Sequence, residues 1–73
     1  MINKEIKFLI DKFEKRIDSY KGGRMINEQI VKGVTDGDWE DANKDMNILE
    51  GAIRATRIAI DDLKNMLKEN KEN

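Results

Sequence analysis

The sequence predicts an all-α protein, an antiparallel helical hairpin that assembles into an oligomeric helical bundle. Three observations favour this fold. The chain has 73 residues and no proline, so no residue prevents long helices. Two segments of nearly equal length, about 2–32 and about 38–69, carry apolar residues at spacings of three and four, which is the pattern of one helix face. Residues 33–37 lie between them, contain two glycines and predict the turn.

The first segment is expected to bury one side only, because charged residues fill the positions between its apolar ones. The apolar positions are Ile2, Ile6, Leu9, Phe13, Ile17 and Tyr20. Asn3 is expected to be the N-cap. Gly22 and Gly23 each cost a helix about 1 kcal/mol relative to alanine, and they form either a loop or a kink within one long helix. Helical spacing then resumes at Met25, Ile26, Ile30 and Val34. Gly33 suits the C-cap.

The second segment carries the most regular pattern in the chain. Thr35 or Asp38 is expected to cap it, with Glu40 and Asp41 at the positive end of its dipole. A heptad-like seam consists of Trp39, Ala42, Met46, Leu49, Ile53, Thr56, Ile60, Leu63 and Leu67. A second stripe runs beside it at Ile48, Ala52, Ala55, Ala59 and Met66. One seam packs one partner helix, so two seams predict contact with more than one helix. Residues 70–73 are expected to fray.

Self-association is expected because a single domain of 73 residues buries little of its surface. The chain has no cysteine and no histidine, so disulfides, thiolate metal sites and the commonest metal ligand are excluded. A partner subunit is the remaining means of support, and we expect a homo-oligomer. The residues expected at its interface are Trp39, Met46, Leu49, Ile53, Ile60 and Leu63.

Composition excludes several functional classes. With 14 basic and 15 acidic residues the net charge is −1, which argues against binding of DNA or RNA. No apolar run approaches the length of a membrane span, and residues 1–10 are too charged for a signal peptide. We therefore expect a cytoplasmic protein without membrane association. No histidine can activate a hydroxyl as a nucleophile, so we expect neither an enzyme nor a cofactor nor a metal site.

Two groups of residues are candidates for binding an anion. Tyr20, Lys21 and Arg24 surround the glycine pair, where a base could stack and flexible backbone could approach a phosphate; an interhelical linker explains the segment equally well. Arg54 and Arg57 share a helix face and suit phosphate geometry. Their alternative role is a salt-bridged surface, through the pairs Glu50–Arg54 and Arg57–Asp61. Folding about Thr35 would place Gly22 and Gly23 across from Leu49 to Gly51.

The run Leu49-Glu50-Gly51-Ala52-Ile53, followed by Ala55 and Ala59-Ile60, resembles the second helix of small phage-encoded helical-hairpin proteins. In these a glycine ends the first helix, as Gly33 would, and an aromatic residue opens the second, as Trp39 would. Part of that group resembles anti-defence proteins that sequester cyclic nucleotide signals of bacterial immunity. Their N-terminal basic-aromatic segment has no counterpart in this chain.

The resemblance implies a phage protein that binds an anionic nucleotide signal between subunits, in the cytoplasm of the host cell, without chemical conversion. The expected ligand-binding residues are Tyr20, Lys21, Arg24, Arg54 and Arg57. Two other classes stay open at this point. One is a structural or assembly protein of a phage particle. The other is a helical module that inhibits a host protein through an exposed face.

Overall fold

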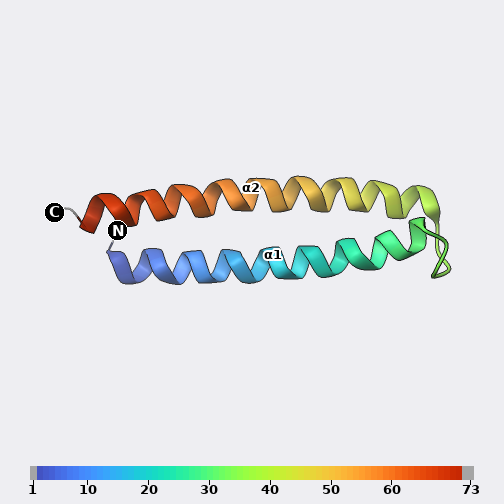
Figure 1. Ribbon diagram of the computed structural model, residues 1–73, viewed down its shortest axis with the longest axis horizontal. Coiled ribbons are helices and arrows are strands. Elements are labelled where there is room, and N and C mark those ends of the chain that lie inside the picture. The colour runs from blue at the N-terminus through green and yellow to red at the C-terminus, as the bar shows by residue number, and fades with distance from the viewer. Residues whose placement is uncertain (1, 72–73) are drawn as a thin grey trace.

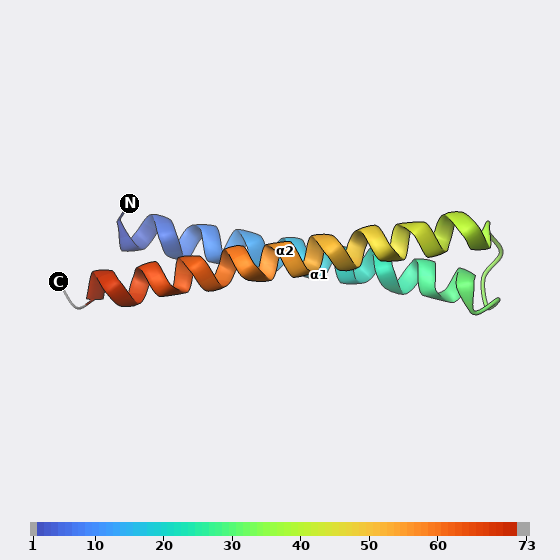
Figure 2. The ribbon, with the colours of Figure 1, turned by 90° about the horizontal axis from the view of Figure 1, so that it is seen from above.

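The computed structural model describes residues 2–71 as two long helices packed side by side in opposite directions (Figure 1). Helix α1 comprises Asn3–Val31 and helix α2 comprises Trp39–Lys71. The molecule measures 54 × 15 × 14 Å, so it is a rod two helices wide. Figure 2 shows the helices crossing at a shallow angle near the middle of their length. The predicted all-α antiparallel hairpin is confirmed.

The glycine pair lies inside α1 and does not interrupt it. A loop at this point is therefore excluded. A Cβ atom added at Gly23 would lie 3.4 Å from the Leu49 side chain, which confirms the predicted register of the hairpin. Backbone amides within an α-helix bond to the carbonyl four residues earlier. The amides of Gly22 and Gly23 are consequently not free to meet a ligand, contrary to the expectation from sequence.

The predicted cap at the start of α1 is wrong. Ile2 occupies the N-cap position, in an extended conformation and without a capping side chain. Asn3 is the first helical residue, and its Oδ1 atom accepts a hydrogen bond of 3.1 Å from Nδ2 of Asn70. The side chain that was expected to cap α1 thus joins the two helices at the open end of the hairpin.

The turn is closed at both ends by hydrogen bonds. Gly33 adopts a φ of +78°, and its N–H donates to Ile30 while the N–H of Val34 donates to Gln29. These two bonds form a Schellman motif, which favours glycine at this position. At the start of α2, the Asp38 carboxylate accepts hydrogen bonds from the N–H groups of Glu40 and Asp41, at 2.9 and 3.1 Å. Asp38, not Thr35, is therefore the N-cap.

The apolar core occupies the half of the hairpin nearest the chain ends. Its buried members are Ile6, Ile10, Ile17, Ile53, Ile60 and Leu63, with Leu9, Phe13, Tyr20 and Leu67 packed around them. The α2 members come from the predicted seam. Ile10 was not predicted, although it lies four residues after Ile6 and completes the same helix face. Ile2, which was predicted on that face, is exposed.

The half of the hairpin nearest the turn has almost no core. Within residues 21–31 no side chain is buried, and in the facing part of α2 only Ala42 is. Met25 and Ile26 were expected to continue the apolar face, but they are 62% and 63% exposed. Because α1 is continuous, Ile26 stands two and a half turns beyond Ile17, on the opposite side of the helix.

The C-terminal part of α2 is longer than predicted. Residues 70 and 71 belong to the helix, so the expected frayed tail does not begin there; its last two positions, 72 and 73, lie outside the described residues. Within residues 2–71, neither helix carries an apolar stretch long enough to span a bilayer.

Candidate anion-binding groove

A shallow groove of about 300 Å³ runs between the helices near the middle of the hairpin. It is lined by Lys21 and Arg24 of α1 and by Glu50, Ile53, Arg54 and Arg57 of α2. Four cations and one carboxylate leave an excess of three positive charges. The cations gather because residues three apart share a helix face and because the antiparallel register places residues 21–24 across from residues 50–57.

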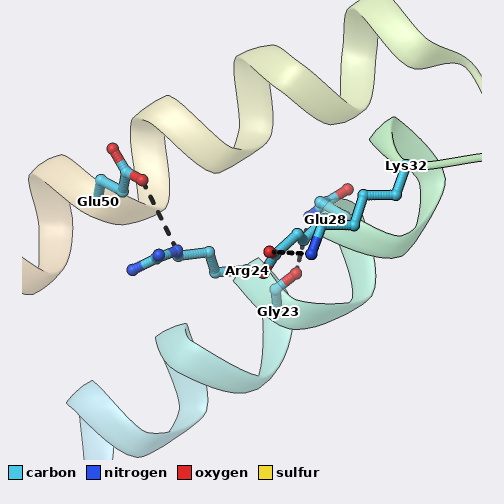
Figure 3. A network of polar contacts seen from close by, with 6 residues as sticks. Gly23, Arg24, Glu28, Lys32 and Glu50 are labelled. Atoms are coloured by element: carbon cyan, nitrogen blue, oxygen red, sulfur yellow. Dashed lines mark hydrogen bonds and ion pairs between the residues drawn. The ribbon is translucent and has the colours of Figure 1, made fainter.

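The groove is crossed by one ion pair. The Nε atom of Arg24 lies 3.6 Å from the Oε1 atom of Glu50, and Figure 3 shows the guanidinium reaching from α1 towards that carboxylate on α2. Both side chains keep more than 40% of their surface exposed. An ion pair as exposed as this contributes about 0–1 kcal/mol, so an anionic ligand could displace Glu50 from Arg24 at small cost.

The ion pairs predicted along α2 do not form. The ion pairs of the described residues include Lys15–Asp11, Arg24–Glu50 and Lys32–Glu28, and neither predicted pair is among them. Glu50 pairs across the hairpin with Arg24 instead of along its own helix with Arg54. Pairs four residues apart stabilise a helix by only about 0.2–0.5 kcal/mol, so a competing partner readily replaces them. Arg54 and Arg57 consequently keep their charge available in the groove.

Tyr20 does not lie in this groove. Its ring is half-buried and packs against the core cluster, because Tyr20 follows Ile17 by three residues and so shares its face. The other four predicted ligand-binding residues all line the groove: Lys21, Arg24, Arg54 and Arg57. Ile53 and Glu50 also line it. Neither was predicted to bind a ligand: Ile53 was expected at the oligomer interface, and Glu50 was expected to pair with Arg54.

A second hollow of about 490 Å³ continues from the first towards the chain ends and shares Lys21 and Arg57 with it. Its remaining lining residues are Glu14, Ile17, Asp18, Ile60, Asp61 and Lys64. Three carboxylates balance three cations here, so the positive excess does not extend along the rod. The positive excess is therefore confined to the end of the groove that Arg24 and Arg54 line.

A second ion pair lies beside Arg24 on α1. The Lys32 ammonium is 2.9 Å from Glu28 (Figure 3). The hydrogen bond and charge of Lys32, followed by the more distant charge of Arg24, hold the pKa of Glu28 below its usual value. A lowered pKa in the folded state contributes stability above the ordinary pKa of the carboxyl, and this contribution is lost as the pH falls. Glu28 thus stays anionic at neutral pH and keeps its ion pair with Lys32.

The residues predicted for an oligomer interface are used mainly within one chain. Ile53, Ile60 and Leu63 are buried in the core between α1 and α2, so they are not available to a second copy. Met46 and Leu49 are half-buried, and Trp39 is exposed at the first position of α2. The buried part of the α2 seam therefore packs against α1, whereas Trp39, Met46 and Leu49 keep part of their surface exposed.

Within the described part of the chain, no cluster of three or more acidic side chains has the arrangement of a metal site.

No known protein family, curated protein or solved structure matches this chain.

Proposed function

We propose that this protein binds a phosphate-bearing small molecule in the groove lined by Lys21, Arg24, Arg54 and Arg57. The observation that carries the proposal is the convergence of these four cations from two helices on one hollow of about 300 Å³. Arginine presents two parallel N–H donors that match phosphate oxygens, and Lys21 adds a mobile charge. In a chain with a net charge of −1, a local excess of three positive charges is a specific feature.

The binding that we propose is non-catalytic. A protein that sequesters its ligand needs affinity and abundance, and it needs no nucleophile, general base or metal. A nucleotide signal, as the resemblance of α2 to anti-defence proteins implies, is the ligand class that we favour. A base in this groove would not stack on Tyr20, because Tyr20 packs against the core and does not line the groove.

Calorimetry with cyclic dinucleotides, cyclic trinucleotides and nucleotides derived from NAD tests the proposal, with pyrophosphate as a probe for phosphate recognition alone. We expect binding that weakens as salt is added, because screening reduces the attraction between exposed charges. Arg54→Glu should abolish this binding. Lys44→Glu changes the net charge by the same amount on the exposed surface of α2 outside the groove, and it should bind as the unaltered protein does.

Glu50→Gln makes the opposite prediction and is the sharper variant. Removing this carboxylate releases Arg24, whose Nε atom it holds at 3.6 Å, and raises the positive excess of the groove. Anion binding should become tighter. Absence of heat with every nucleotide and with pyrophosphate at tens of micromolar would refute the proposal, as would equal binding by the Arg54→Glu and Lys44→Glu variants.

A further inference from the structure

An apolar stripe on α2 is only partly covered by the hairpin, since Ala52 and Ala59 are half-buried and its other members are exposed. It consists of Ile48, Ala52, Ala55, Ala59 and Met66. Ile48 is 68% exposed and Met66 is 38% exposed, and Ala55 is also exposed. Gly51 lies beside the stripe, and no atom that α1 contributes would lie within 4 Å of a Cβ added there. The small residues of this part of α2 are thus not explained by close packing against α1.

The stripe lies on the opposite side of α2 from the basic groove. Ile48 precedes Arg57 by nine residues, and Met66 follows it by nine. Nine residues are two and a half helical turns, so both apolar side chains point away from Arg57. A molecule that covered the stripe would leave the groove open, and the inference below does not depend on the proposed anion binding.

The accessible surface area of the chain indicates how much surface a partner molecule could bury. The protein exposes 5670 Å², whereas a compact monomer of 8.5 kDa exposes about 4,700 Å². The excess is about 1,000 Å², and one partner in a standard interface buries about 800 Å². An elongated rod exposes more surface than a compact chain of the same mass, and the excess is large enough to supply one interface of ordinary size per chain.

We infer that this molecule is a second copy of the chain. Its α2 packs antiparallel to the first α2, and the two copies are related by a two-fold axis that crosses the stripe at the level of position 57 along the helix. A two-fold interface brings together the same patch of both copies, with residue i opposite residue j and j opposite i. The stripe fits this rule. Positions 48 and 66 are equally distant from 57, as are 55 and 59, so Ile48 faces Met66 of the second copy and Ala55 faces Ala59.

The sizes of these side chains suit a close crossing of two helices. The separation of packed helices is set by the side chains at the contact; alanines at the centre permit a short one, and Ile48 and Met66 fill the wider space at both ends. Asp62 interrupts the stripe, but position 62 faces position 52, where the small Ala52 leaves the carboxylate room to reach water. The product is a four-helix bundle of two hairpins with the two basic grooves on its outer sides.

Another exposed apolar site lies near the chain ends and offers an alternative contact. It is a hollow of about 480 Å³ lined by Ile2, Lys4, Glu5, Phe8 and Leu9. It covers only two turns of α1 and contains two charged residues, so it lacks the length and symmetry of the α2 stripe. Phe8 is 66% exposed and serves as the matched control, since a charge at this position leaves the fold and the stripe intact.

Sedimentation equilibrium over a range of concentrations is the first test. We expect a species of twice 8.5 kDa for the unaltered protein and for Phe8→Glu. Ala55→Glu should sediment as a single chain and keep its helical circular dichroism, because Ala55 lies outside the core. The inference is overturned if the unaltered protein is monomeric at tens of micromolar, or if Phe8→Glu dissociates the dimer and Ala55→Glu does not.

Disulfide trapping tests the direction and register. The chain has no cysteine, so each introduced thiol is unique. Air oxidation of an equimolar mixture of the Ile48→Cys and Met66→Cys variants should give the mixed disulfide as the main product, and each variant alone should cross-link poorly. Efficient cross-linking of Ile48→Cys to itself would indicate parallel helices and overturn the arrangement, as would the absence of any mixed product.

Discussion

The glycines of this protein show how the same residue has different effects at different positions. Gly33 is required by the backbone, since its φ of +78° lies in a region that side chains with a Cβ rarely adopt. Gly37 is required by packing, because an added Cβ would lie 2.9 Å from two atoms of Ile30. Gly22 meets neither condition. It is helical and exposed, and among the described residues nothing lies within 4 Å of its missing Cβ.

Gly22→Ala is therefore expected to stabilise the protein by about 0.5–1 kcal/mol, because glycine in a helix loses more backbone entropy on folding than alanine does. Gly33→Ala is expected to destabilise it by about 1–2 kcal/mol, because the Cβ atom of alanine is strained in the left-handed conformation. Urea denaturation followed by circular dichroism measures both. A stabilising effect of Gly33→Ala, or a destabilising effect of Gly22→Ala, would contradict this account of α1 and its C-cap.

At the scale of the elements, α1 and α2 are each continuous but their two halves are packed differently. The half that contains Ile6, Ile17 and Ile60 has a buried core, whereas residues 21–31 bury no side chain. Towards the turn, the helices are held by half-buried contacts such as Gly23 against Leu49, by the ion pair of Arg24 with Glu50, and by the caps of the turn. The basic groove lies at the boundary between the two halves.

Hydrogen exchange should therefore reveal a gradient of stability along the rod. Local opening is easiest where few apolar side chains are buried, so the amides of residues 24–31 and 43–49 should exchange faster than those of residues 8–18 and 55–65. Mass spectrometry of deuterated peptides, or nuclear magnetic resonance of individual amides, measures the rates. Equal protection in the two halves would show that the exposed apolar residues near the turn, such as Ile26, are covered in solution.

At the scale of the whole molecule, the hairpin is a rod with a radius of gyration of 16.4 Å, whereas a compact domain of this length would have about 11 Å. A rod two helices wide has no third layer, so each helix can bury only the side that faces the other. This shape leaves Ile48, Ile58 and Met66 in contact with solvent while Ile53 and Ile60, on the same helix, are buried.

Ile53→Asp and Ile58→Asp compare the two sides of α2. Ile53 is only 5% exposed and belongs to the core cluster, so a carboxylate there loses its hydration without a partner, and we expect the chain to unfold. Ile58 is 59% exposed, and the same substitution should change stability by less than about 0.5 kcal/mol. Thermal unfolding checks both. Cooperative unfolding of Ile53→Asp near the temperature of the unaltered protein would contradict the position of the core.

The sequence by itself determined the fold class, the register of the hairpin and the seam of α2, because a spacing of three and four is a local property that a helix converts directly into one face. It also predicted that four of the five candidate residues lie close together, since the register that brings Gly23 to Leu49 also brings Lys21 and Arg24 to the groove of Arg54 and Arg57.

Only the tertiary structure decided that α1 runs unbroken through Gly22 and Gly23, because packing against α2 outweighs the local cost of two glycines. That continuity turned Ile26 outwards and Tyr20 against the core. The structure also decided that Glu50 pairs with Arg24 and that Ile53, Ile60 and Leu63 pack against α1. The partners of these residues lie on the other helix, and the spacing of residues along one helix does not specify which side chain of the other helix they contact.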